Sequence, residues 1–422
     1  MNSHAVRCAI IITILALAWP LPPATAEPEP ALTLADCYAL ALKQSEVVAI
    51  HQELINEAEA RLIQARSGIL PRASFESTDK RQDGSGASAF TLRHVPERRF
   101  AFSQPLFSGF REFAAMAEMK AERRQRIFEK TRAEQLLLID VAEAFYLLLE
   151  QREDLGTLEM IRGTLQERID ELHGREQLGR SRPSEVVSAE AQLLRIEAEE
   201  ERVRNQETIA RQTLEFLTGR DQIRVLKDTA PSSPAIHDES SYLVSAPTRP
   251  DVQAAQEAAR AAQSQISVAR ADLWPSAHAE GNYYVERAGV AKDIAWDASL
   301  VVSIPIFEGG QVHGAVRQAN AQEREAELQT AQTRRQAVRE IRDAYATLYA
   351  INAQREALIK ALNAADENYR LQVEDYRRNL VNNLDVLQGL QNLEDARRDF
   401  IHAQYETKRS YWRLRAATGQ VL

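Results

Sequence analysis

The chain has 422 residues, of which 44% are hydrophobic and 6% aromatic, and its formal net charge is −9 at pH 7. This length allows two or three ordinary domains or one elongated object, and the few glycines (16) and prolines (15) favour an elongated helical one. The acidic balance argues against a nucleic-acid partner, because phosphate backbones are bound by an excess of basic charge.

The first 26 residues have the order of a secretory signal peptide. Arg7 precedes an apolar run from Ala9 to Trp19, and Ala24-Thr-Ala26 follows it. We therefore expect cleavage after Ala26 and export of the chain. A retained membrane anchor is the alternative, but the run is shorter than the roughly 20 residues that span a bilayer. Cys37 is then the one cysteine left, and we expect a buried helix residue rather than a disulfide.

The remaining sequence is a long internal duplication. Ser103-Gln-Pro-Leu-Phe-Ser-Gly109 returns as Ser303-Ile-Pro-Ile-Phe-Glu-Gly309, and Thr218-Gly219 returns as Thr418-Gly419. A repeat of this length is a whole structural unit rather than a short stacking repeat. We expect one unit at 27–220, a linker rich in proline and serine at 221–247, and a second unit at 248–422.

Each unit should open with a helix. Thr33 and Asp36 have the spacing of a capping box, and helix-forming residues then continue to about Ser67. The counterpart in the second unit runs from Pro250 to about Asp272.

A pair of strands follows each of these helices. After Pro71 and Pro275 the apolar period changes from helical to two, which predicts β-hairpins at about 71–107 and 275–307. Strands of about 10 to 12 residues, tilted near 45°, match one bilayer crossing. A hairpin packed on a soluble core is the alternative, but the flanking helices are too long to fold back over it.

Alternation along these strands divides their side chains between two faces. The face expected to contact lipid carries Phe100, Phe102, Leu300, Val302 and Ile304. The face expected to line a lumen carries Ala101, Ser103, Ser299 and Ser303.

Long helical hairpins complete the units, at about 109–218 and 309–418. Leucines and other apolar residues recur in heptads along them, for example at Leu148, Leu158 and Leu165, which is typical of coiled coils. The helix from about 109 to 177 would be on the order of 100 Å long.

Four strands cannot close a barrel, and lipid does not tolerate an open sheet edge. The chain is therefore expected to share a barrel with other copies. Three copies would supply twelve strands, an even number with room for an open lumen, whereas two copies would supply eight and a filled interior. The helical hairpins would extend this barrel as a tunnel across the periplasm.

The duplicated order of elements, the Pro-[Leu/Ile]-Phe-x-Gly entry into each long helix, and the Gly/Asn-x5-[Glu/Asp]-Val tips resemble the TolC-type outer membrane efflux protein family. The resemblance covers nearly the whole chain after the signal peptide. It implies an α+β membrane protein: a homotrimer with a 12-stranded β-barrel in the outer membrane of a Gram-negative bacterium and a coiled-coil α-barrel in the periplasm. It further implies that a periplasmic adaptor of an inner-membrane transporter docks at the hairpin tips, which open to release cargo.

The resemblance assigns docking and gating to the hairpin tips, at Gly179, Ser184, Glu185, Val186, Tyr376, Asn379, Asp385 and Val386. Asn379 stands where the family has glycine, and asparagine also tolerates the left-handed turn. Some members lock the tip with a tyrosine linked to an arginine and an aspartate. Tyr376 is present, but Val381 and Gln388 occupy the partner positions, which leaves Glu185 as a possible hydrogen-bond acceptor for Tyr376.

Two interpretations of the tip acids remain open. In three copies, Glu185 and Asp385 would bring six acidic side chains to the periplasmic mouth and make a cation-sensitive constriction. Alternatively, they cap the first turns of the returning helices, where carboxylates are favoured.

The sequence carries no motif for catalysis, a cofactor or a metal; its eight histidines are scattered without ligand spacing. Two rival functions remain. A type I protein secretion channel would share this architecture, and a periplasmic coiled-coil scaffold without membrane strands would extract in the soluble fraction.

Overall fold

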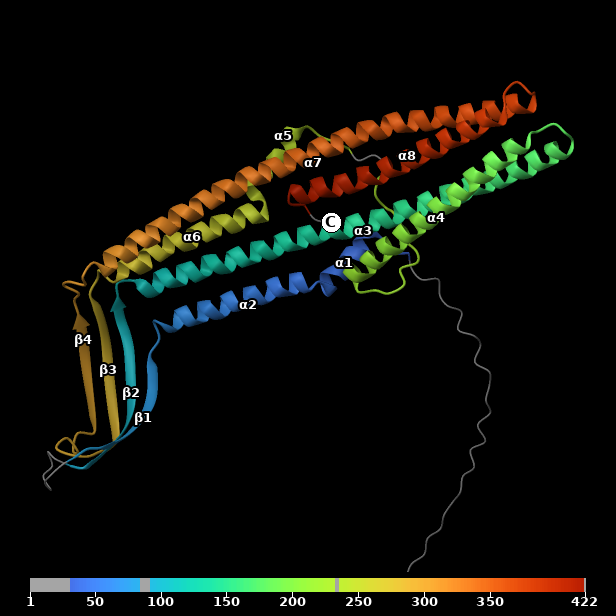
Figure 1. Ribbon diagram of the computed structural model, residues 1–422. Coiled ribbons are helices and arrows are strands. Elements are labelled where there is room, and N and C mark those ends of the chain that lie inside the picture. Colours follow the sequence, from blue (N-terminus) through green and yellow to red (C-terminus); the bar gives the residue numbers. More distant parts are fainter. Residues whose placement is uncertain (1–30, 84–91, 232–234, 421–422) are drawn as a thin grey trace, which may run out of the picture.

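The computed structural model describes residues 31–83, 92–231 and 235–420 (Figure 1). The signal peptide predicted at 1–26 lies outside the described residues. The elements, in chain order, are α1 (Leu34–Gln44), α2 (Glu46–Ser67), β1 (Arg72–Arg81), β2 (His94–Ser108), α3 (Arg111–Gln177), α4 (Pro183–Thr218), α5 (Glu239–Leu243), the 3-10 helix η1 (Ala246–Thr248), α6 (Pro250–Ala271), β3 (Ser276–Arg287), β4 (Trp296–Ser303), α7 (Gln311–Arg377) and α8 (Asn383–Ala417).

The molecule is elongated, with all four strands at one end and the turns of the two long helical hairpins, α3–α4 and α7–α8, at the other (Figure 1). Helices α3 and α7 each have 67 residues, as the uninterrupted helical pattern predicts, and are therefore about 100 Å long. Helix α3 is central and packs against α2, α4, α6 and α8. None of the described helices combines the length and apolar content that a bilayer crossing requires.

The first unit opens with two helices, although the sequence predicts one. The capping box of Thr33 and Asp36 is formed and starts α1. The chain then becomes extended at Ser45 (φ −66°, ψ 113°), whose hydroxyl accepts a hydrogen bond from Val48 N at 3.3 Å and starts α2. Because no glycine or proline marks this break, helix propensity alone did not reveal it.

The strands form one antiparallel sheet in the order β1-β2-β3-β4. β3 begins at Ser276, which pairs with Ser303 at the end of β4. Ile304 therefore lies one residue beyond the strand, and its prediction as a strand residue is wrong, because no neighbouring strand of this chain continues to pair there.

Apolar heptad residues form the core of the helical hairpins. Leu148, Leu158, Leu165 and Leu172 are completely buried. Polar residues that interrupt the pattern are paired: Arg162 lies 3.3 Å from the buried Glu200. Cys37 is buried, as predicted, in the same cluster as Leu148 at the level of α1.

The described parts of the segment 221–247 pack against the helices. Leu32 N donates to Val225 O at 3.0 Å, and Lys227 N donates to Leu32 O at 2.9 Å. Asp228 pairs with Lys408 of α8, and Ile223 is buried.

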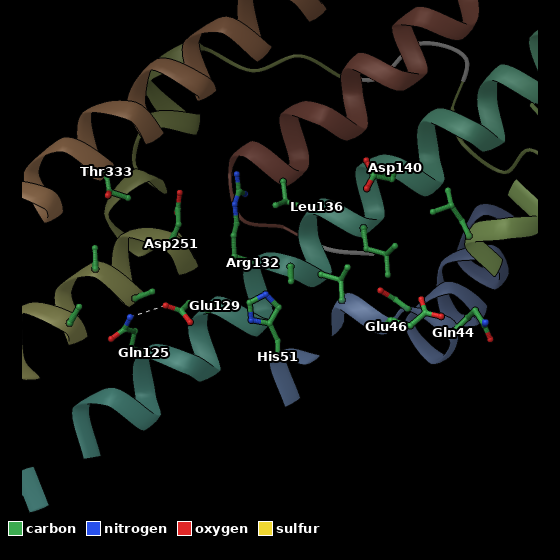
Figure 2. A pocket seen from close by; sticks show the side chains of 18 of the residues that line it. Gln44, Glu46, His51, Gln125, Glu129, Arg132, Leu136, Asp140, Asp251 and Thr333 are labelled. Atoms are coloured by element: carbon green, nitrogen blue, oxygen red, sulfur yellow. Dashed lines mark hydrogen bonds between the residues drawn. The ribbon is translucent and has the colours of Figure 1, made fainter. Parts of the chain in front are cut away.

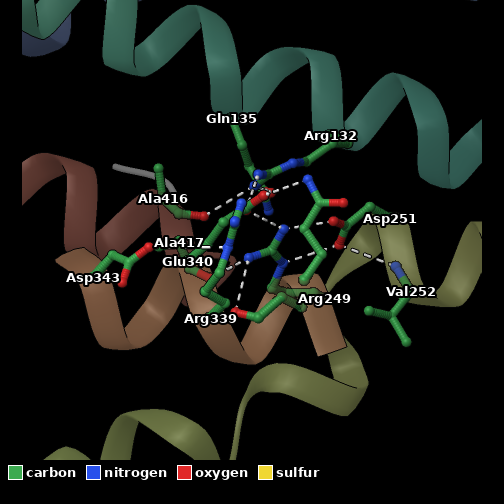
Figure 3. Close-up of polar contacts among 12 residues, drawn as sticks. Arg132, Gln135, Arg249, Asp251, Val252, Arg339, Glu340, Asp343, Ala416 and Ala417 are labelled. Carbon is green, nitrogen blue, oxygen red and sulfur yellow. Dashed lines mark hydrogen bonds and ion pairs between the residues drawn. The ribbon is translucent and has the colours of Figure 1, made fainter. Parts of the chain in front are cut away.

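A buried arginine joins three helices where the second unit begins (Figure 3). The Arg249 side chain is 0% exposed; it donates to Asp251 Oδ1 at 3.0 Å, to Glu340 Oε2 at 2.7 Å and to the Ala417 carbonyl at 3.3 Å. Burial alone would raise the pKa of Asp251, but the hydrogen bonds and charge of Arg249 outweigh it and hold that pKa below its ordinary value. This contact ties the start of α6 to α7 and to the end of α8.

Candidate functional site

The two hairpin tips turn in the same way at equivalent positions. Gly179 (φ 71°) and Asn379 (φ 59°) both adopt the left-handed conformation. Arg180 N donates to the Arg175 carbonyl at 2.8 Å, and Leu380 N donates to Asp375 O at 2.9 Å. The expectation that asparagine replaces glycine in this turn is confirmed, since its short polar side chain tolerates positive φ.

Tyr376 does not face solvent at the tip but lies against two arginines of the other hairpin. Its side chain is 5% exposed. The guanidinium carbon of Arg168 lies 3.7 Å from the ring centroid, and that of Arg175 lies 4.4 Å from it. Both distances fall within the range of cation–π attraction, which strengthens when the groups are desolvated.

Arg168 also holds the returning helix of the second hairpin. Its Nε donates to Asn383 Oδ1 at 2.9 Å, and Asn383 Nδ2 donates to the Glu185 carbonyl at 3.4 Å. The Arg168 side chain is 8% exposed, and its Nη2 has no partner among the described residues. Arg168 thus connects α3 with both α7 and α8.

The hydrogen bond considered between Tyr376 and Glu185 is not formed in the described part of the chain. The Glu185 carboxylate instead accepts from Ser181 Oγ at 2.7 Å. Tyr376 packs on α3 because the positive charges of Arg168 and Arg175 attract its aromatic ring.

The two tip acids differ in their local role. Asp385 completes a capping box with Asn382: Asn382 N donates to Asp385 Oδ2, and Asp385 N donates to Asn382 Oδ1, both at 3.1 Å. The equivalent N-cap of α4, Arg182, has no side-chain cap. The capping interpretation therefore holds for Asp385, whereas Glu185 lies in the first turn of its helix without forming a cap.

The remaining tip residues divide between core and surface. Val186 and Val386 are 3% and 2% exposed and pack in the apolar core of the tips, while Ser184 is exposed. The tips present several apolar side chains to solvent, among them Leu178, Leu380 and Leu384, with exposures of 71%, 69% and 68%.

Sequence reasoning missed these leucines as well as Arg168, Arg175 and Asn383. A signal for Arg168 was present, because it directly precedes Ile169 and follows Leu165 by three residues, on the buried side of the coiled coil.

At the other end of the molecule, the strand side chains separate into two faces. Phe100, Phe102, Leu300 and Val302 are 44% to 65% exposed and lie on one face. Ala101 and Ser299 point to the opposite face, because successive strand residues alternate.

A cavity of about 800 Å³ lies on the side of the helical bundle, lined from α1, α2, α3, α4, α6 and α7 (Figure 2). Val47, Leu136 and Phe216 line it and are 59%, 46% and 79% exposed. Gln125 Nε2 donates to Glu129 Oε1 at 2.8 Å within it, and burial raises the pKa of Asp140. Across residues 31–83, 92–231 and 235–420, no group of three or more His, Cys, Asp or Glu could hold a metal ion.

Comparison with known proteins agrees with this architecture. Residues 246–420 match the family model "Outer membrane efflux protein". The chain is 27% identical over 207 residues to outer membrane protein OprJ of Pseudomonas aeruginosa, covering 45% of this chain and 42% of OprJ. It is 24% identical over 320 residues to outer membrane protein TolC of Vibrio cholerae, covering 72% of each. The crystal structure of CusC shares the fold, with a TM-score of 0.81 at 18% identity over 92% of both chains.

The chain combines a small antiparallel sheet with two long helical hairpins, and the relatives that it matches are outer membrane proteins. Residues 246–420 of the chain resemble outer membrane efflux proteins, and longer stretches are similar to the outer membrane proteins OprJ and TolC. The segment matched in OprJ is less than half of that relative's length.

Proposed function

We propose that this chain is the outer membrane channel of a tripartite efflux system, a passive duct built from three copies. The observation that carries the proposal is the sheet. Its edge strands β1 and β4 are each paired on one side only within the described residues, and one of its faces is apolar and exposed. An open edge is not tolerated in lipid, so other copies must continue the sheet, and three copies give twelve strands.

The helical side of the molecule supports the same assembly. Phe216, Val47 and Leu136 expose apolar surface around the lateral cavity. A monomer leaves this surface in water, although burying it would be favourable by about 25 cal/mol per Å². A neighbouring copy in a closed ring would cover this surface.

We further propose that the hairpin tips receive a periplasmic adaptor linked to an inner-membrane transporter. Leu178, Leu380 and Leu384 form an apolar end surface, and Gly179, Ser184, Glu185, Asn379 and Asp385 surround it, while Val186, Tyr376 and Val386 support it from within. A duct of this kind needs no catalytic residue, and we assign none to this chain.

Fractionation, mass measurement and conductance test the proposal together. The protein should remain with the outer membrane until detergent is added, have the mass of a trimer in mild detergent, and conduct ions in a planar bilayer. Recovery in the soluble periplasmic fraction, or as a monomer in mild detergent, would contradict it.

A further inference from the structure

We propose that the outer boundary of the bilayer lies at a row of four aromatic side chains, Phe75, Phe100, Tyr283 and Trp296. The strand segments beyond this row would then form a collar outside the membrane, in water. The inference rests on the channel function proposed above and adds to it the height at which the sheet meets the lipid headgroups.

The row crosses the whole sheet at one height. Phe75 pairs with Phe100, Phe100 with Tyr283, and Tyr283 with Trp296. Directly paired residues share a face, and the rings of Phe75 and Phe100 are 5.1 Å apart. The four side chains are 44% to 68% exposed. Aromatic side chains with this exposure are favoured where a membrane meets water, because tyrosine and tryptophan have an apolar body and a polar end.

On the helix side of the row, the same face is small or apolar. The paired residues there are Phe102, Gly281 and Ala298, followed by Ala279, Leu300 and Val302. The amide nitrogen of Gln104 on this face donates to the carbonyls of Ile69 and Pro105. This part of the face therefore suits hydrocarbon.

On the outer side of the row, the same face becomes charged after one further apolar side chain, Val285, which is 59% exposed at a register shift between β2 and β3. Arg98, two residues before Phe100, pairs with Glu286 at 2.7 Å, and both side chains are about half exposed. Asp79 and His94 form a further contact at 2.6 Å. Charged groups on a lipid-facing strand cost about 2–4 kcal/mol at midplane and little near the interface, so the hydrocarbon must end below Arg98.

The opposite face is also charged beyond the row. Arg99 lies 2.7 Å from Glu76, and Arg287 lies 3.6 Å from Glu97. A sheet that has ion pairs on both faces is suited to water on both sides. The outer parts of β1, β2 and β3 thus differ from the parts nearer the helices, where only one face is polar.

The apolar span on the helix side of the row continues beyond the end of β4. Exposed apolar side chains continue from Trp296 past the end of β4 to Phe307, which is 88% exposed. The strand from Trp296 to Ser303 extends about 23 Å, or about 16 Å at a tilt near 45°, and the exposed apolar residues after it continue toward the roughly 25 Å of the apolar band in outer-membrane barrels.

Depth-dependent fluorescence quenching tests the position of the row. Trp19, Trp274 and Trp412 are replaced by phenylalanine so that Trp296 alone emits, and the protein is reconstituted in phosphatidylcholine vesicles with bromine at defined depths of the acyl chains. We expect bromine near the headgroup end to quench Trp296 several-fold more than bromine near the chain end. A matched protein that also carries Trp296→Phe and Val302→Trp should show the reverse preference.

The outcomes separate the two proposals. Strongest quenching of Trp296 by deep bromine, or no quenching of Trp296 while the Val302→Trp protein is quenched, would overturn the boundary at this row and leave the channel standing. If neither protein is quenched at any depth, the sheet is not in the bilayer and the proposed function itself is wrong.

Discussion

The Tyr376 ring of the second helical hairpin lies 3.7 Å from the guanidinium carbon of Arg168 in the first hairpin, and both side chains are buried. The two hairpins of one copy are therefore held together at the tip by a charge against an aromatic face rather than by a tyrosine hydrogen bond. In this contact the Arg168 guanidinium is attracted by the aromatic ring of Tyr376 and not by its hydroxyl.

Tyr376→Leu should loosen the tip, whereas Tyr376→Phe should not. Leucine removes the aromatic face from the buried Arg168 and the partly exposed Arg175, at a cost of about 1–2 kcal/mol, and phenylalanine keeps it. Hydrogen exchange of the tip amides in detergent should become faster for Tyr376→Leu only. Equal acceleration in both variants would mean that the hydroxyl matters and the ring does not.

Asn379→Ala should destabilise the second tip by about 1 kcal/mol, because alanine is strained at a φ of 59°. Asn379→Gly is the matched control and should be neutral or slightly stabilising, since Gly179 already occupies the equivalent turn at a φ of 71°. The apparent Tm in detergent measures both. A loss of stability in the glycine variant would show that the Asn379 side chain contributes more than its backbone geometry.

Replacing Glu185 by Gln and Asp385 by Asn should weaken block of the channel by divalent cations. Six carboxylates would be lost from the mouth of a trimer, while asparagine preserves much of the cap that Asp385 forms with Asn382. Single-channel conductance with and without Mg²⁺ measures the block. An unchanged block would leave capping by Asp385 as the one supported role of these acids.

Val302→Lys should impair assembly far more than Ser303→Lys. Val302 is 57% exposed on the apolar face of β4, where a lysine near the bilayer midplane costs about 2–4 kcal/mol. Ser303 points to the opposite face, which we expect to line the lumen. The yield of detergent-resistant trimer compares the two variants, and equal yields would show that the assignment of the two faces is wrong.

Glu199 should contribute stability at neutral pH that is lost only in strong acid. Hydrogen bonds from Arg202 and Arg398 lower the pKa of Glu199 from 4.5 to about 2. A lowered folded-state pKa means that the contribution is complete above about pH 4.5 and disappears as the pH falls through 2. Because the pair is partly solvated, we expect Glu199→Gln to cost about 1 kcal/mol at pH 7. Thermal unfolding at pH 7 and at pH 2 should show a difference from the parent protein at pH 7 and almost none at pH 2.

The sequence by itself determined the elements that depend on local pattern. Long helices around 109–177 and 309–377 follow from uninterrupted helical periodicity, and the strand hairpins follow from prolines that precede a period of two. The left-handed turn at Asn379 could also be predicted locally, because asparagine tolerates a positive φ.

Tertiary structure decided the contacts between residues far apart in the chain. Arg168 reaches Asn383, 215 positions later, and buried Arg249 reaches Glu340 and Ala417; no periodicity encodes these distances. β4 ends at Ser303 because β3, its partner, begins at Ser276. The alternation of the sequence alone predicted a strand that continued to Ile304. A local pattern specifies which face of an element is apolar, but the partner of a buried charge is set only when the elements pack, because only then is that charge removed from water.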